Sequence, residues 1–338
     1  MADACVTAAS RERWLEVAKA CPCATYFHTP YWYELIAPGQ RHIAVDVTFD
    51  DGVSAIIPIA KIKRAWGLLM DHFSSPPGGA YGGWFSASAL NAGHIRTLAK
   101  ILTSHKNLTF RINPFDNSQT SLLTVTMPAP SSSIMLMNDF THTLDLTKGR
   151  AALLQGMARG HRSAAKIAER GGIVIKTAET VDEWEKYYGL YMDSVNRWLA
   201  GGPERRPRII HPPELFRRIR ENRTGHEILW LAVKDGEPVS GAVVFYWGRH
   251  AVYWHGASAA KYFHLRPNNL LFREIIADAA DRGAEIFDFN PSGGYGGVET
   301  FKERFGARRV AAPVLLTRTP LRAFVSRIRR CCQAGRQK

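Results

Sequence analysis

Hydrophobic and polar positions along the chain follow two periods, and each period predicts a different kind of element. Runs in which apolar residues alternate every second position predict strands, and longer runs with a period near 3.6 predict helices. The Asp50-Asp51-Gly52 sequence between two strand-like runs is typical of a hairpin turn. In the first half, the expected helices span 9–21, 30–36 and 87–104, and the expected strands span 43–49, 53–63 and 108–113.

The second half repeats this order of elements after a Pro- and Ser-rich stretch, 128–133, which is typical of a linker or long loop. Asp235-Gly236 indicates another hairpin. Antiparallel hairpins followed by a helical crossover in each half predict an α/β (α+β) chain of two tandem domains, with mixed sheets flanked by helices. The expected helices span 150–170, 180–199, 212–222 and 268–282, and the expected strands span 172–178, 226–234, 238–247, 250–256, 285–289 and 310–317.

Composition is compatible with two well-packed domains. The chain has 338 residues, 46% hydrophobic content and nine Trp, which is enough apolar material for two cores. No apolar run approaches the roughly 18 residues of a spanning helix, and the first residues lack the features of a signal peptide, so we expect a cytoplasmic protein. The five cysteines are odd in number and form no zinc-type spacing, which favours reduced thiols.

Positive charge is concentrated in two places along a chain of net charge +14. The last 38 residues carry eleven Lys plus Arg and a single Glu, and a second basic group lies within 159–170. Such patches attract the phosphates of nucleic acid, anionic lipid or a nucleotide-linked substrate, and the sequence does not rank these three. A solvated surface without a partner is the alternative.

The stretch 282–306 carries the strongest candidate chemistry. It reads as a helix end, a strand, a Gly-rich loop and a short helix with Phe301, Lys302 and Phe305. A cationic Lys between two aromatic residues beside such a loop could bind an anionic group of a ligand. The alternative is that the two Phe belong to an ordinary core and Lys302 is their solvated neighbour.

This stretch resembles the closing segment of the Fem-type (FemAB-like) aminoacyltransferases and their relatives in the GNAT acyltransferase superfamily. Four further segments agree: 159–171 resembles the family's basic helix, 193–198 its next helix, 27–32 its opening segment and 76–83 its first-domain substrate loop. The resemblance spans roughly 25–318. It implies two GNAT-like domains, 1–140 and 141–318, followed by a basic tail, 319–338.

The resemblance also implies a site. Lys302 would stabilise the tetrahedral oxyanion of acyl transfer or the phosphates of the donor, in a groove between the halves that the 74–83 loop lines on its other side. We expect Lys302→Ala to reduce turnover with little loss of stability. The general base stays open among Asp71, His72, His255 and Asp288. The expected substrate-binding residues are Tyr81, Arg159, His161, Arg162, Arg197, Trp198, Arg266, Asn268, Asn269 and Tyr295.

One departure bears on the acyl donor. Acetyl-CoA enzymes of the superfamily carry a Gly-rich turn whose N–H groups bind pyrophosphate at a helix N-terminus, whereas 263–269 of this chain has no Gly. Arg266 can still meet a phosphate, and Pro267 suits the first turn of a helix. This departure weakens the case for CoA in its usual pose, so the donor stays open between acyl-CoA, a variant acyl thioester, aminoacyl-tRNA and another donor. The twelve His form no metal-binding motif, so we expect no metal.

The resemblance therefore implies an N-acyl or aminoacyl transferase acting on an amine of a cell-envelope or polysaccharide precursor. One alternative is an acyl-CoA-dependent N-acyltransferase of a small-molecule amine. Another is a non-catalytic basic protein that binds RNA or membrane. Residues 320–332 have the pattern of a short basic amphipathic helix, which would either attach the protein to the inner face of an anionic membrane or pack on the second domain.

Overall fold

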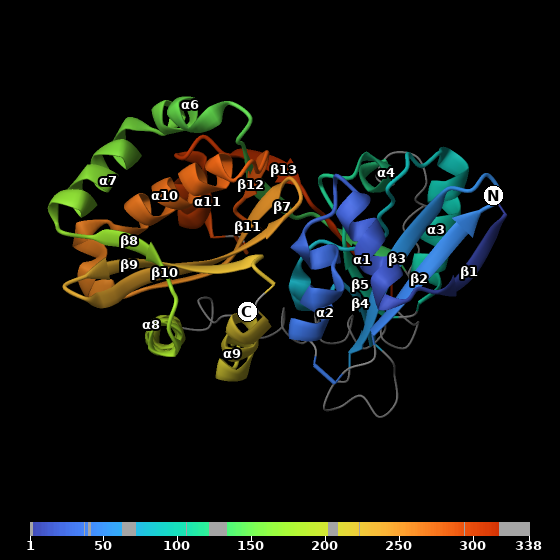
Figure 1. Cartoon of the computed structure of the whole chain (residues 1–338), viewed down its shortest axis with the longest axis horizontal. Coiled ribbons are helices and arrows are strands. Elements are labelled where there is room, and N and C mark those ends of the chain that lie inside the picture. Colours follow the sequence, from blue (N-terminus) through green and yellow to red (C-terminus); the bar gives the residue numbers. More distant parts are fainter. Residues whose placement is uncertain are drawn as a thin grey trace, which may run out of the picture. The chain divides into compact units, whose positions relative to one another are not determined.

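The computed structural model describes residues 3–36, 38–39, 42–62, 72–105, 107–121, 134–201, 209–222, 224–293 and 295–317. Contacts divide the chain into two compact units (Figure 1). Unit 1 runs to Phe140 and resumes at Ala311, and unit 2 comprises Thr141–Val310. The expected linker, 128–133, and the expected tail, 319–338, lie outside the described residues.

Unit 1 is built on a mixed sheet whose strands have the order β1-β2-β3-β4-β5-β14-β6. The expected hairpin at Asp50–Gly52 joins β2 to β3, and Gly52 has the positive φ that such a turn needs. An unexpected edge strand, β1, pairs with β2. The strands are β1 (Ala4–Ala8), β2 (His42–Phe49), β3 (Ser54–Ile62), β4 (His72–Ser75), β5 (Leu108–Arg111), β6 (Ile134–Met137) and β14 (Val314–Thr317).

The helices of unit 1 begin where side chains cap them. Ser10 caps α1, and Asn91 caps α3 by accepting hydrogen bonds from the N–H groups of Gly93 and His94. For this reason α3 begins at Ala92 rather than at the expected residue 87. The helices are α1 (Arg11–Ala20), α2 (Pro30–Ile36), α3 (Ala92–Ser104), α4 (Asn117–Thr120) and the 3-10 turns η1 (Tyr26–His28) and η2 (Pro77–Gly79).

The strand expected over 310–317 is two strands that belong to different sheets. β13 (Arg308–Ala311) lies at the edge of the second sheet, whereas β14 lies between β5 and β6 of the first sheet and is antiparallel to both. Pro313 separates them, because a proline cannot donate to a strand ladder. The last described strand therefore returns to unit 1 after unit 2 is complete.

Unit 2 is built on a second mixed sheet with the order β13-β7-β12-β11-β10-β9-β8. The expected hairpin at Asp235-Gly236 joins β9 to β10, and both residues have positive φ, as a type I′ turn requires. β11 and β12 are parallel, whereas the other pairings described in this sheet are antiparallel. The strands are β7 (Phe140–Asp145), β8 (Val174–Thr177), β9 (Glu227–Lys234), β10 (Glu237–Trp247), β11 (His250–Ser258) and β12 (Ile286–Asp288).

Helices cover both faces of this second sheet. Figure 1 shows α6, α7 and α10 on one side of the sheet and α8 and α9 on the other, in agreement with the contacts of α10 and α8 with the strands. The helix expected over 150–170 is interrupted at Met157, which has an extended backbone. The helices are α6 (Gly149–Gly156), α7 (Arg159–Arg170), α8 (Val181–Ala200), α9 (Pro213–Asn222), η4 (Ala260–Leu265), α10 (Pro267–Asp281) and α11 (Gly296–Glu303).

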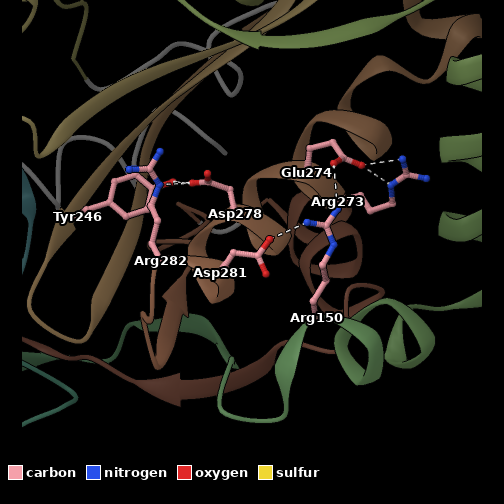
Figure 2. A network of polar contacts seen from close by, with 7 residues as sticks. All are labelled: Arg150, Tyr246, Arg273, Glu274, Asp278, Asp281 and Arg282. Carbon is pink, nitrogen blue, oxygen red and sulfur yellow. Dashed lines mark hydrogen bonds and ion pairs between the residues drawn. The ribbon is translucent and has the colours of Figure 1, made fainter.

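A network of polar contacts surrounds the outer side of α10 (Figure 2). Arg150 of α6 pairs with Asp281 at 2.6 Å, and Arg282 pairs with Asp278 at 2.5 Å while its guanidinium lies over the ring of Tyr246. Exposed ion pairs of this kind contribute about 0–1 kcal/mol each. The network therefore orients α10 against α6 and β10, while buried apolar residues of α10 such as Leu271 and Ile275 supply most of the packing. The two mixed sheets with flanking helices are the expected α/β (α+β) fold.

Candidate active site

A pocket lies where two parallel strands of unit 2 diverge. β11 pairs with β12 over only three residues, from His250 to Val252. β12 then ends, and Asn290 turns the chain away with a φ of 60°, while β11 stays paired with β10 as far as Ser258. Beyond Val252, β11 is therefore paired with β10 along one edge, and the pocket lies beside its other edge.

The pocket has a volume of about 340 Å³. The sheet, the segment after β12 and the helices on both faces of the sheet contribute to its walls. The lining residues are Ser194, Arg197 and Trp198 of α8, Gly241 of β10, Tyr253, Gly256, Ala257 and Ser258 of β11, Phe263 of η4, Asn268 and Phe272 of α10, Phe289, and Gly297, Val298, Phe301 and Lys302 of α11. Four predicted site residues, Arg197, Trp198, Asn268 and Lys302, thus meet at one pocket.

Lys302 is a buried residue of this pocket, with a relative exposure of 2%. Its Nζ atom donates a hydrogen bond to the carbonyl oxygen of Asn290 at 2.5 Å. The rings of Phe301 and Phe305 contact each other edge to face beside it. Lys302 is therefore not a solvated neighbour of the two Phe. Its burial leads us to expect that its removal lowers stability, because a buried hydrogen bond would be lost with it.

Positively charged side chains line the pocket. The pKa of the buried His142 is lowered, first by burial and then by the positive charge of Lys302. Arg197 adds a second cation to the lining, and the lining residues include no Asp or Glu. A developing oxyanion in this pocket would meet positive charge in surroundings of low polarity, where such an interaction is strong.

Arg197 is held in place at the end of α8. Its Nη2 atom donates to the hydroxyl of Ser194 at 3.1 Å and to the carbonyl oxygen of Ser258 at 3.4 Å. Its guanidinium lies 5.4 Å from the ring centroid of Phe263. These contacts fix the charge of Arg197 at the pocket wall. Because the side chain is already ordered, ligand binding would cost less conformational entropy.

A polar group lies at the N-terminus of α10. The side-chain oxygen of Asn268 accepts hydrogen bonds from Ser240 at 2.5 Å and Ser258 at 3.0 Å. Pro267 occupies the first turn, as expected, and Arg266 precedes it in a left-handed conformation with φ 56°. The Arg266 side chain is exposed and outside the pocket lining, and Asn269 is buried.

The other residues predicted on the basic helix do not line the pocket. His161 is buried and packs on Phe301 and Phe305, and burial, with a smaller effect of Arg304, lowers its pKa to about 4. It therefore supports α11 as a neutral ring. Arg162 is exposed and donates to the carbonyl oxygens of Gln155 and Met157 at the interruption before α7. Arg159 and Tyr295 are likewise exposed.

Two predicted residues belong to unit 1. Tyr81 is fully buried and in ring contact with Phe27 and Phe115, so its ring is part of the packing of that unit. His72 begins β4. Asp71, and Gly294 of the Gly-rich loop, lie outside the described residues.

The two candidate bases of unit 2 are not among the residues that line the pocket. Asp288 is fully buried, and its Oδ1 atom accepts hydrogen bonds from Thr141 at 2.5 Å and from the N–H of Asn290 at 2.9 Å. His255 shares a 2.7 Å hydrogen bond with the hydroxyl of Tyr187, and burial, assisted by His211, lowers its pKa to about 3. Asp288 thus stabilises the turn that opens the pocket, and His255 is neutral near pH 7.

Several lining residues were missed by sequence reasoning. These include Ser258, whose cross-strand partner is Ser240, and Gly241 and Gly256, which lie nearby on the same two strands. A Cβ on Gly256 would lie 2.2 Å from the hydroxyl of Tyr253. Glycines inside strands often mark such close approaches, so this pair is the signal that could have identified the pocket wall.

Two further observations concern the described part of the chain. No group of three or more His, Cys, Asp or Glu side chains there is placed to hold a metal ion. Among the helices of the described ranges, none combines the length and apolar character needed to cross a bilayer.

Comparison with known proteins agrees with this geometry. Residues 157–303, which contain every lining residue, match the family described as acetyltransferase (GNAT) domain. The fold is similar to that of FemX, with a TM-score of 0.68 and 14% identity over 94% of this chain and 98% of that chain. No curated protein sequence matches significantly.

Two other solved structures share the fold across nearly the whole chain. A C-terminal domain of a putative lysylphosphatidylglycerol synthetase from Agrobacterium fabrum has a TM-score of 0.55 and 13% identity over 93% of this chain and 95% of that one. A tandem GNAT protein from the clavulanic acid biosynthesis pathway has a TM-score of 0.51 and 11% identity over 94% of this chain and 99% of that one. Residues 157–303 are therefore a GNAT acetyltransferase domain, within a chain that has a FemAB-like tandem GNAT fold.

Proposed function

We propose that this protein transfers an acyl or aminoacyl group to an amine of a cell-envelope or polysaccharide precursor. The similarity to FemX over almost the full length of both chains supports this choice, as does the similarity to a putative lysylphosphatidylglycerol synthetase domain. The observation that carries the proposal is the pocket between β11 and β12, in which the buried Lys302 and the fixed Arg197 stand among apolar walls.

The pocket suits the acyl end of an extended donor. Past Val252, β11 loses its pairing with β12, so an extended chain can lie along the strand edge at this place. The aromatic walls formed by Tyr253, Phe272 and Phe289 would exclude water from the carbonyl carbon. Arg197 of α8 would bind an anionic part of the donor or acceptor.

The proposed reaction needs a cation near the carbonyl oxygen. The acceptor amine attacks the ester or thioester carbonyl, the C–N bond forms, and the bond to the leaving oxygen or sulfur breaks through a tetrahedral oxyanion. Lys302 would stabilise that oxyanion, because its buried ammonium is held in the pocket by the carbonyl oxygen of Asn290. The polar group of Ser240, Ser258 and Asn268 would orient the donor beside the strand.

A second candidate is an acyl-CoA-dependent transferase for a small-molecule amine, and one observation favours it. An aminoacyl group carries an α-ammonium, for which the lining offers no Asp or Glu. An uncharged acyl group would avoid the free-energy cost of burying an unpaired ammonium. One feature counts against this candidate. The turn before α10 lacks the Gly residues that bind the pyrophosphate of CoA in related enzymes, and its left-handed position is occupied by Arg266.

The basic regions motivate the partners in this proposal. An aminoacyl-tRNA donor or an anionic membrane surface would both be attracted by the positive charge that the sequence concentrates near its C-terminal end. On this basis we propose a cytoplasmic enzyme that works at the inner face of the membrane.

A panel of donors tests the proposal. The full chain is incubated with aminoacyl-tRNA, with acyl-CoA thioesters or with neither, and the melting temperature and the transfer of label to amine acceptors are measured. Stabilisation and transfer with aminoacyl-tRNA, but not with deacylated tRNA, are the results expected for the first candidate. Transfer from acyl-CoA alone would replace it by the second. No transfer with any donor would contradict both.

A further inference from the structure

Two cysteines of unit 1 lie in direct contact. Cys21 ends α1, where its N–H donates to the carbonyl oxygen of Val17 at 3.0 Å, and Cys23 follows two residues later. Their Sγ atoms are 3.2 Å apart, and both thiols are reduced. A disulfide requires a separation of about 2.05 Å, so a movement of roughly 1.2 Å would join them.

The two thiols differ in access. Cys21 is buried, with a relative exposure of 4%, whereas Cys23 is partly exposed and lines a cavity of about 520 Å³. The cavity is rich in hydroxyl and amide groups that can bind a small peptide-like molecule. These lining groups are Ser86, Ser88, Asn117, Ser118 and Ser121.

The surroundings hold Cys23 in place beside a carboxyl group. The amide of Asn113 donates to the carbonyl oxygen of Cys23 at 2.8 Å, which fixes the backbone. Asp116 lines the same cavity and is buried, and its Oδ1 atom accepts from the N–H of Ser118 at 2.8 Å. A dithiol, a rigid backbone and a proton acceptor thus meet at one accessible cavity, remote in sequence from the GNAT domain of 157–303.

We propose that Cys21 and Cys23 are a redox-active dithiol that exchanges with low-molecular-weight disulfides, such as glutathione disulfide, and closes to an intramolecular disulfide. The Cys23 sulfur attacks one sulfur of the small disulfide and expels the first thiolate. The Cys21 sulfur then attacks Cys23 and expels the second. One protein S–S bond forms as one small-molecule S–S bond breaks, two electrons leave the protein, and the two thiol protons end on the two released thiols.

The contact between the sulfurs makes the exchange chemically accessible. A hydrogen bond from Cys23 lowers the pKa of Cys21, so one thiolate of the pair is stabilised by the S–H of the other. The pKa of Cys23 is raised, first by its hydrogen bond to Cys21 and then by burial, so Cys23 must lose its proton as it attacks, and Asp116 of the same cavity is the acceptor. Burial raises the pKa of Asp116, which makes its carboxylate a better proton acceptor during the first attack.

Peptide mapping tests this proposal on the full chain. The protein is equilibrated in glutathione buffers of graded redox potential, blocked with N-ethylmaleimide and digested with trypsin. Cleavage after Lys19 and Arg41 yields a peptide whose only cysteines are Cys21 and Cys23, and cleavage after Arg11 isolates the exposed Cys5 as an internal control. We expect the 20–41 peptide to lose both maleimide groups and two hydrogen masses in one two-electron transition, while Cys5 gains only glutathione.

Single variants establish the order of attack. Cys21→Ser should trap glutathione on Cys23, because the resolving thiol is missing, whereas Cys23→Ser should leave the buried Cys21 unmodified over the same period. If the wild-type 20–41 peptide keeps both maleimide groups while Cys5 is glutathionylated, or if it ends with stable glutathione adducts, the proposed disulfide is wrong. Equal glutathionylation of the two variants would overturn the assigned order.

Discussion

The Nζ atom of Lys302 lies 2.5 Å from the carbonyl oxygen of Asn290, and this hydrogen bond joins α11 to the turn at which the chain leaves β12. Asn290 has a φ of 60°, a left-handed conformation that Asn tolerates better than most residues. The turn it forms separates β12 from β11. The cation proposed to act on the substrate therefore also stabilises the geometry that opens the pocket.

Replacing Lys302 tests this double role. Lys302→Met keeps most of the side-chain volume and removes the charge. We expect turnover to fall by about 10²-fold or more, because the oxyanion loses its cation, and the free energy of unfolding to fall by about 1–3 kcal/mol, because the buried carbonyl loses a charged donor. Steady-state kinetics and urea unfolding measure the two effects.

Lys234→Met is the matched control. Lys234 is a partly exposed residue of the same unit, where it pairs with Asp235 at 3.1 Å. The control should change turnover less than twofold and stability by under about 0.5 kcal/mol. Equal turnover in Lys302→Met and Lys234→Met would exclude a catalytic role for Lys302.

The hydrogen bonds of Asn268 give a second prediction. Asn268→Ala should destabilise the protein by about 1–3 kcal/mol, because the buried hydroxyls of Ser240 and Ser258 lose their common acceptor. In a Ser240→Ala, Ser258→Ala background the same change should cost much less. Urea unfolding of the four proteins measures this coupling, and additive effects would show that the three side chains do not act together.

The pH dependence of stability gives a third prediction. The pKa of His161 is about 4 in the folded protein and about 6.5 when unfolded. Between these values the unfolded chain binds more protons, so this histidine's contribution is complete above pH 6.5 and is lost as the pH falls towards 4. His161→Gln should therefore flatten the decline of unfolding free energy in that range. An unchanged slope, equal to that of the exposed His264→Gln control, would refute the assignment.

The basic C-terminal residues give a fourth prediction. If they attach the protein to anionic lipid, the full chain should co-sediment with vesicles containing phosphatidylglycerol, and a chain ending at Thr319 should not. Each basic residue near the surface contributes about 1 kcal/mol, and salt should weaken the binding. Equal and salt-insensitive sedimentation of the two proteins would rule out attachment through these residues.

Local features of the fold could be predicted from the sequence, and long-range pairing could not. Asp50–Gly52 and Asp235-Gly236 identify their hairpins because the turn chemistry lies within a few residues. The membership of β14 in the first sheet depends on partners about two hundred residues away, as in the pairing of Leu315 with Phe110. Periodicity identifies a strand and gives no information on its neighbours.

The same limit applies to the candidate site. The resemblance of 282–306 to the Fem-type segment pointed to Lys302, but its burial depends on how α11 packs beside β12. Arg197, Trp198 and Asn268 reach the pocket with Lys302, whereas Arg266 and His161 do not, although all five were expected there. Helical spacing places His161 on the apolar face of α7, where it packs on Phe301, and leaves Arg159 and Arg162 on the exposed face.

Blocking the pocket tests the central claim most directly. Val298 lies at the pocket with 42% of its surface exposed, so Val298→Trp can fill the opening without disturbing the core, and Val181→Trp, at a position 52% exposed on α8, is the matched control. The affinity of the donor found in the panel is measured by titration calorimetry for both variants and the wild type. We predict that Val298→Trp weakens binding at least about tenfold, or about 1.4 kcal/mol, while Val181→Trp binds like the wild type. Wild-type affinity in Val298→Trp would contradict the assignment of this pocket as the donor site.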